Sequence, residues 1–483
     1  MHQFPCAAPE DVGVPSRAIC HFIKKLEKYQ IPMHSILMTR HGKLITEGYY
    51  APYDADTLHR MFSVSKSFTS AAIGLMAEEG RISLDDPVIQ YFPDKLPHQI
   101  HPWIARMTIR DMLKMQTCHT GTTYKLHPER DWVESFFITE PSHQPGTVFN
   151  YDTSSSHTLC ALVERLAEKP MLDYLRDRFL THAGFSTQAY MIKDPFGISM
   201  GGSGLMATPK DLLLFALIIM NNGNLGGTQL LPDWYIREAV SQQADTLMNG
   251  AAREECQGYG YQFWRISQDG FACYGMGGQL AICLPGYDFI CVTTGDTQGI
   301  QGGNQTIYNT LYEEVLPYLT ESTLPADPGE QQKLKGLLRQ LSIKPLDGNS
   351  TSSLMSEIQG LSYQLQKNSS GFTSLLLEFD TEHQEGRLNI GWEDQSLTLH
   401  FGLGHMVTGS FPIYAQRCAA SGCWLAEDTL YIKSHLIDEC VGSVHCKLVF
   451  RNHTVTVFMK KIEETYFNEF SGYFYGTCSG RQE

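Results

Sequence analysis

The sequence lacks features that would mark membrane, secreted or nucleic-acid-binding proteins. Its longest apolar run, residues 212–220, has 9 residues, about half of what a bilayer requires. The N-terminus has no basic segment followed by an apolar core, so no signal peptide is expected. Positive charge is also scarce, with 37 Lys and Arg against 52 Asp and Glu. We therefore predict a cytoplasmic protein that binds neither nucleic acid nor a membrane.

The cysteine and histidine spacings match no metal or disulfide template. The 13 cysteines are odd in number and include no C-x-x-C pair; the nearest approach is Cys418 to Cys423. The pattern favours reduced, mostly buried thiols. The C-terminal histidines fit no ligand spacing either; they are His400, His405, His435, His445 and His453. We expect no metal and no cofactor.

The chain alternates between strand-like and helix-like patterns, and about 150 residues per domain suggests two or three domains. Residues 34–50 predict two strands joined at His41-Gly42, and further strands are predicted within 259–294. Helical patterns fill most of 62–245. Both chain ends of this domain should therefore contribute to one antiparallel sheet, with helices inserted between, which is an α+β sandwich. One of these helices is predicted over 209–220, after an N-cap at Thr208.

The C-terminal part has a different pattern. A segment rich in Pro, Gly and acids begins at residue 321, and beyond about 350 short alternating strands follow one another without a long helix. We predict a first domain over 1–320, a linker over 321–349, and an all-β antiparallel barrel or sandwich over 350–483.

The strongest chemical signal is Ser63-Val64-Ser65-Lys66, near the start of a helix predicted over 63–79. Residues three apart share a helical face, so the Ser63 hydroxyl and the Lys66 amine can meet. A serine hydroxyl becomes nucleophilic when a base takes its proton, and a buried lysine amine can be that base. Free N–H groups in the first helical turn also favour developing negative charge.

This segment resembles the serine β-lactamase superfamily, and most of all its class C-like branch of esterases, nylon-oligomer hydrolases and D-amino-acid peptidases. The similarity runs in order over about residues 10–320, and its stretches are FSVSKSFTSAAIGLMAEEGRISLDDPVIQYFPD, MTIRDMLKMQTCHTGT, QPGTVFNYDTSSSHTLCALVERLAEKPMLDYL, GGSGLMATPKDLLLFALIIMNNG and YGMGGQLAICLPGYDFICVTT.

The resemblance implies roles for individual residues. Ser63 matches the acylated nucleophile, Lys66 its partner on the helix, and Tyr151 the tyrosine that relays a proton to the leaving group. Thr153 stands where the family usually has a substrate-binding Asn. The N–H of Met276 is expected to join that of Ser63 in holding an oxyanion.

The strand that carries Met276 has no Lys-Thr-Gly element, whose lysine binds substrate carboxylates in many members. Gly275, Gly277 and Gln279 flank Met276 and are expected to bind substrate, and the glycines would let a substrate backbone approach closely.

The resemblance implies a serine hydrolase acting on a small ester or amide that needs no carboxylate. A β-lactamase or D-alanyl-D-alanine carboxypeptidase is one alternative, and a catalytically weak sensor or binding module is another. A homo-oligomer is left open.

Overall fold

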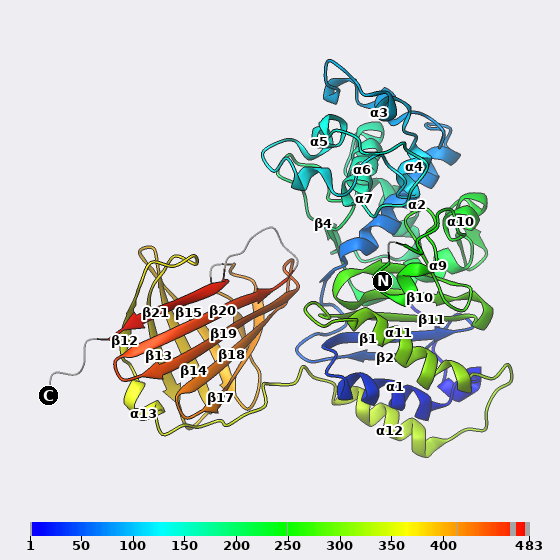
Figure 1. Ribbon diagram of the computed structural model, residues 1–483. Coiled ribbons are helices and arrows are strands. Elements are labelled where there is room, and N and C mark those ends of the chain that lie inside the picture. The colour runs from blue at the N-terminus through cyan, green and yellow to red at the C-terminus, as the bar shows by residue number, and fades with distance from the viewer. Residues whose placement is uncertain (1, 249, 413, 464–469, 479–483) are drawn as a thin grey trace. The chain divides into compact units, whose positions relative to one another are not determined.

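The computed structural model describes residues 2–248, 250–412, 414–463 and 470–478 (Figure 1). The chain divides into two compact units. The first comprises residues up to Tyr49, Asp54–Thr297 and Gln301–Leu341, and the second comprises Tyr50–Tyr53, Gln298–Ile300 and the residues from Ser342 onward.

A six-stranded antiparallel sheet forms the centre of the first unit, in the order β2-β1-β11-β10-β9-β8. Its strands are β1 (Met33–Arg40), β2 (Lys43–Tyr49), β8 (Trp264–Ile266), β9 (Gly270–Gly275), β10 (Gln279–Leu284) and β11 (Phe289–Gly295). The N-terminal strand β1 pairs directly with β11, with Leu37 opposite Val292. Figure 1 shows the blue strands beside the green ones. The predicted sheet from both chain ends is confirmed.

Helices cover both faces of this sheet (Figure 1). On one side lie α1 (Ser16–Lys28), α11 (Gly303–Glu314) and α12 (Pro328–Arg339). On the other, α9 (Pro209–Met220) packs against β1, β10 and β11. The predicted cap of α9 is present, because Thr208 accepts a hydrogen bond from the Asp211 N–H and the Asp211 carboxylate accepts from the Thr208 N–H.

The inserted region is mainly helical and places α2 (Ser65–Glu78) against α6 (Thr153–Ala167). The remaining helices are α3 (Pro102–Arg106), α4 (Ile109–Leu113), α5 (Trp132–Ile138), α7 (Met171–Leu175), α8 (Thr181–Ala183) and α10 (Asp233–Ala239). The short strands are β3 (His59–Arg60), β4 (Tyr190–Met191), β5 (Leu205–Ala207), β6 (Asn224–Leu225) and β7 (Thr228–Gln229). Among the described residues, no helix has the length and apolar character needed to cross a membrane.

Residues 321–349, where the sequence predicts a linker, are partly structured. They contain α12, which packs against α1 and buries Leu334. The physical reason is an amphipathic pattern: α12 turns leucine toward α1 and its charged residues toward solvent.

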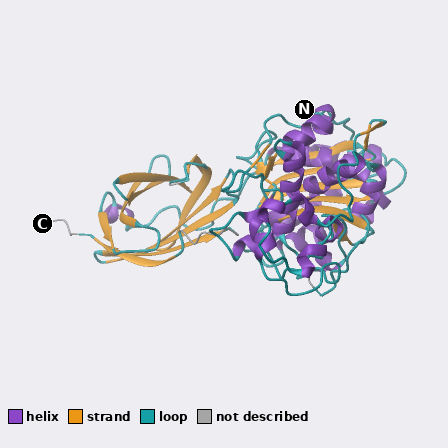
Figure 2. Cartoon of the chain, turned by 90° about the horizontal axis from the view of Figure 1, so that it is seen from above, coloured by secondary structure: helices purple, strands orange, loops and turns teal. Residues whose placement is uncertain are grey.

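The second unit is built on a sheet that closes into a β-barrel (Figure 2). Its strands are β12 (Ser362–Leu365), β13 (Phe372–Asp380), β14 (Glu385–Trp392), β15 (Gln395–Leu403), β16 (Val407–Ser410), β17 (Arg417–Ala426), β18 (Thr429–Leu436), β19 (Gly442–Arg451), β20 (Thr454–Ile462) and β21 (Gly472–Thr477), with one short helix, α13 (Met355–Ile358). A parallel pairing of β15 with β17 closes the ring, and β16 extends from β17 outside it. Of the two β-architectures predicted for this region, the barrel is the one observed.

Candidate active site

Ser63 lies in a tight turn that leads into α2. The turn spans Phe62–Val64, and Phe62 has a φ of 45°, a left-handed conformation that is rare for a bulky side chain. The preceding Met61 fixes the turn on two sides. Its N–H donates to the Leu205 carbonyl at 2.8 Å, and its carbonyl lies against Gly275, where a Cβ would come within 2.4 Å. The nucleophile predicted from the sequence therefore lies between β5 and the end of β9.

Lys66 is buried, with 1% of its surface exposed, and its amine is surrounded by oxygen atoms. Nζ donates to Ser63 Oγ at 3.0 Å, to Thr153 Oγ1 at 3.3 Å and to the Gly202 carbonyl at 2.7 Å. Burying an amine is costly unless its protons find acceptors, and these three oxygens supply them. The Ser63–Lys66 pair and Thr153, which come from distant parts of the sequence, thus meet at one point.

Tyr151 completes this group from the residue before the α6 cap. The Lys66 Nζ lies 4.9 Å from the centre of the Tyr151 ring, within the range of a cation–π contact. The ring stacks on Trp264 at 5.5 Å and meets Tyr259 edge-on at 6.2 Å. The aromatic packing holds the Tyr151 ring beside the amine.

Asp152, which the sequence reasoning did not single out, caps α6 beneath these residues. Its carboxylate accepts from the Ser154 N–H at 2.8 Å, from the Ser155 N–H at 3.2 Å and from the Ser154 hydroxyl. Burial raises the pKa of Asp152 to about 6, although these hydrogen bonds and the Lys66 charge oppose the rise. An Asp followed by a Ser-rich helix start is an N-cap pattern, and this signal could have identified it.

This pKa predicts a pH dependence of stability. Since the folded value is above the ordinary value of 3.8, the folded state holds the Asp152 proton more tightly than the unfolded state does. Its contribution is therefore fully present below about pH 4 and is lost as the pH rises through about 6. Asp152→Asn keeps a capping side chain but cannot ionise. We expect the unfolding free energy of the wild type, relative to this variant, to fall by up to about 3 kcal/mol over that range. Urea unfolding at several pH values measures it, and a constant difference would contradict it.

Two glycines hold the loop before β5 against α2 and α6. A Cβ on Gly201 would come within 2.2 Å of the Cys160 Cβ, and one on Gly202 within 2.5 Å of Thr153 Cγ2. Thr69 Oγ1 donates to the Gly201 carbonyl at 2.8 Å. Because both positions lack side chains, the Gly202 carbonyl can reach Lys66. The sequence reasoning noted this glycine run but assigned it no contact with the lysine.

The turn between β9 and β10 carries the other predicted residues. Met276–Gly278 form a single turn, with Gly277 at a φ of 79°. The Gln279 amide donates to the Met276 carbonyl at 3.1 Å and to the Gly295 carbonyl at 2.8 Å, and accepts from the Gly295 N–H at 3.2 Å. Gln279 thus supports the turn, because its side-chain amide is bonded to backbone groups of its own chain. Gly275 likewise leaves room for the Met61 carbonyl of its own chain.

An acidic residue absent from the prediction stands near this turn. The Tyr274 hydroxyl donates to Glu255 Oε1 at 2.7 Å, and Glu255 Oε2 accepts from the Ala251 N–H at 3.1 Å. Burial raises the pKa of Tyr274, so its hydroxyl keeps the proton. Over the described part of the chain, no Lys, Arg or His lies within 4.0 Å of the Glu255 carboxylate. The Tyr274 ring lies 5.8 Å from Trp264, which also packs on Tyr151. Glu255 therefore adds an uncompensated negative charge beside the aromatic wall of the site.

Comparison with known proteins identifies the family of this chain. Residues 19–299, more than half of the chain, match the family model described as Beta-lactamase. The chain belongs to the beta-lactamase family. The matched range contains Ser63, Lys66, Tyr151 and Met276, and it ends before the barrel. The family resemblance and the α+β fold predicted from the sequence are confirmed.

Relatives within the family are distant. "Protein flp" of Staphylococcus aureus is 26% identical over 199 residues, covering 37% of this chain and 40% of the relative. The 6-aminohexanoate-dimer hydrolase of Paenarthrobacter ureafaciens is 21% identical over 223 residues, covering 43% and 57%. The chain thus spans about half the length of these curated relatives. The solved structure of EstCE1, a hydrolase with promiscuous acyltransferase activity, aligns with a TM-score of 0.50 at 16% identity, covering 61% and 97%, and shares the fold.

Proposed function

We propose that the protein is a serine hydrolase that cleaves a small ester or amide through an acyl-enzyme on Ser63. The observation that carries this proposal is the 3.0 Å contact between Ser63 Oγ and the buried Lys66 Nζ. A nucleophile and a base within hydrogen-bond reach, with the base held by further groups, is the arrangement that nucleophilic catalysis needs.

The reaction would proceed in two stages. With Lys66 uncharged, its amine takes the Ser63 proton while Oγ attacks the substrate carbonyl carbon, and the N–H groups of Ser63 and Met276 hold the resulting oxyanion. Tyr151 passes a proton from Lys66 to the leaving alcohol or amine, whose bond to the acyl carbon breaks. Water then attacks the acyl-enzyme, releasing the acid and restoring the Ser63 hydroxyl. Thr153 and the Gly202 carbonyl keep the amine oriented.

Glu255 favours a substrate without a carboxylate. Its carboxylate accepts a hydrogen bond from the hydroxyl of Tyr274, which is two residues before Met276 in the sequence. The carboxylate would repel an anion that approached this side of the site. The sequence also lacks the lysine with which many relatives bind a carboxylate. Both features support a neutral or cationic ester or amide over a penicillin-like acid.

This preference predicts the effect of one substitution. Among p-nitrophenyl esters of butyrate, 4-trimethylammoniobutyrate and succinate, we expect the anionic succinate ester to have a kcat/KM about tenfold below the neutral one. Glu255→Gln should narrow that gap, because glutamine still accepts from Tyr274 but carries no charge. Glu330→Gln, the same change on α12, serves as control. If the ratio of kcat/KM between the neutral and the anionic ester is unchanged in Glu255→Gln, the Glu255 carboxylate does not select against anionic substrates.

The proposed function itself is tested by covalent labelling. A fluorophosphonate should form an adduct located on Ser63 by mass spectrometry, and p-nitrophenyl butyrate should be turned over faster than nitrocefin. Rapid nitrocefin cleavage with negligible esterase activity would assign a β-lactamase instead. A folded protein that neither labels nor turns over any ester would support the binding module.

A further inference from the structure

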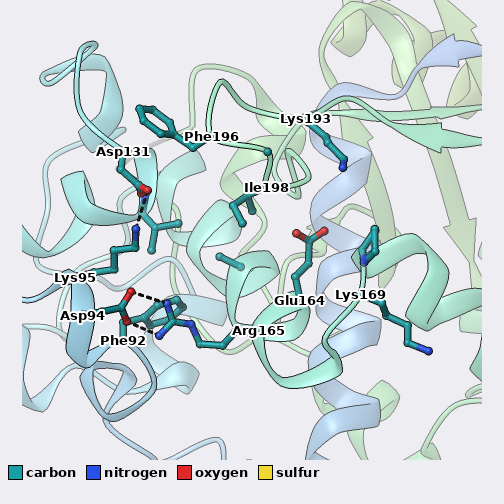
Figure 3. A pocket seen from close by; sticks show the side chains of 14 residues that line it. Phe92, Asp94, Lys95, Asp131, Glu164, Arg165, Lys169, Lys193, Phe196 and Ile198 are labelled. Carbon is teal, nitrogen blue, oxygen red and sulfur yellow. Dashed lines mark hydrogen bonds and ion pairs between the residues drawn. The ribbon is translucent and has the colours of Figure 1, made fainter.

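The first unit contains a cavity that is formed by none of the residues that surround Ser63 (Figure 3). Its volume is about 510 Å³, within the range of small-molecule binding sites. The walls come from the C-terminal half of α6, the turn at 93–95, the start of α5 and the loop 193–198. A cavity of this size, with walls separate from the Ser63 site, can hold a small molecule of its own.

Hydrogen bonds fix the loop that forms one wall. The buried Asp194 accepts from His157 Nε2 at 3.0 Å and from the Phe196 and Ile198 N–H groups, each at 2.9 Å. Glu164, on α6, accepts from the Ser199 N–H at 3.4 Å. Because the backbone is tied at both ends, the cavity exists before any ligand arrives, which lowers the cost of binding.

Most charges on the cavity wall are already neutralised. Arg165 forms two hydrogen bonds with Asp94, at 2.5 and 3.0 Å, and Lys95 pairs with Asp131 at 2.8 Å; Figure 3 draws both pairs on one side. Lys169, on the other side, pairs with Asp177 at 2.8 Å.

Of the charged residues that line the cavity, Lys193 and Glu164 form no ion pair with any described residue, and they differ in their hydrogen-bond partners. Glu164 is occupied by two backbone N–H groups, those of Met171 at 2.9 Å and Ser199 at 3.4 Å. For Lys193, by contrast, the described residues provide no acceptor within hydrogen-bond distance and no carboxylate within 4.0 Å of its ammonium. Lys193 is exposed, and among the described lining residues it is the cation without a counter-ion, whereas both Glu164 oxygens are already bonded to backbone N–H groups.

Apolar side chains form the rest of the wall: Phe92, Val133, Ala161 and Ile198. We propose that this cavity binds a small organic carboxylate, which pairs with Lys193 and lays its hydrocarbon part on these side chains. An ammonium–carboxylate hydrogen bond selects the charge, and apolar burial supplies affinity in proportion to the area covered. This binding does not depend on hydrolysis at Ser63.

Calorimetric titration of the full chain with hexanoate tests the proposal. We expect saturable binding, and hexylamine, of equal length and opposite charge, should bind about ten- to a hundredfold more weakly. Lys193→Met should weaken hexanoate binding by a similar factor, while Lys210→Met, the same change on α9, should leave it unchanged. Ser63→Ala should bind hexanoate like the wild type, which separates this cavity from the proposed catalytic site.

A second variant covers the case in which Lys193→Met is unstable. Ile198→Trp fills the cavity with a large apolar side chain and leaves Lys193 in place. This variant should lose hexanoate binding because the space is occupied, while its thermal unfolding stays cooperative. The proposal is overturned if hexanoate does not saturate, if hexylamine binds as tightly, or if either cavity variant retains wild-type affinity. Loss of binding in Ser63→Ala would place the ligand at the proposed catalytic site instead.

Discussion

Replacing Ser63 by alanine is expected to lower kcat/KM for p-nitrophenyl butyrate by about 10⁴-fold or more and to abolish fluorophosphonate labelling. The alanine removes the atom that forms the acyl bond, and no neighbouring group substitutes for it. The fold should survive, since Lys66 keeps its bonds to Thr153 and Gly202. Initial rates and intact-protein mass spectra measure the loss, and the unfolding temperature verifies the fold.

Ser65→Ala provides the matched control two residues away. The Ser65 hydroxyl accepts from the Leu205 N–H at 2.9 Å, so its loss affects packing at β5 and leaves the nucleophile in place. We expect this variant to keep its label and most of its activity. Undiminished turnover in Ser63→Ala, or labelling lost only in Ser65→Ala, would refute the assignment of the nucleophile.

The second large effect is expected from Lys66→Met, which nearly preserves the side-chain volume but removes the amine. Without a base, acylation should slow by about 10²–10⁴-fold. We expect this decrease in kcat and in the single-turnover rate constant for acylation. Labelling at long times should persist, because Ser63 itself is intact. Stopped-flow release of p-nitrophenol measures the acylation step.

Stability must be followed separately in this variant. The Gly202 carbonyl loses its 2.7 Å donor in a buried position, which costs about 1–3 kcal/mol. Lys66→Arg keeps the charge and offers donors, but guanidinium does not give up its proton near neutral pH, so activity should not return. Full activity in the arginine variant would show that position 66 acts only as a charge.

Local sequence patterns correctly predict those elements whose contacts are made between residues close together in the sequence. The hairpin at His41-Gly42 and the capped helix after Thr208 depend on a few adjacent residues, and both are present in the structure. The approach of Ser63 to Lys66 likewise follows from helical spacing alone.

The contacts that the sequence did not reveal join distant segments. Gly202 reaches Lys66 across 136 positions, and no periodic pattern encodes which carbonyl will face a buried amine. Glu255 lies on a short turn between two elements, where side-chain direction depends on the surrounding fold. The sequence likewise does not show that the side-chain amide of Gln279 bonds to the backbone of β11.

The pairing of β1 with β11 has a consequence for synthesis of the chain. About 250 residues separate Leu37 from its partner Val292, so the first hairpin leaves the ribosome long before the strand that must cover its inner edge. Throughout that interval the row of N–H and C=O groups along β1 is open to other polypeptides. This sheet therefore cannot close before residue 295 has been synthesised, which makes the pairing of β1 with β11 a long-range and late contact in folding.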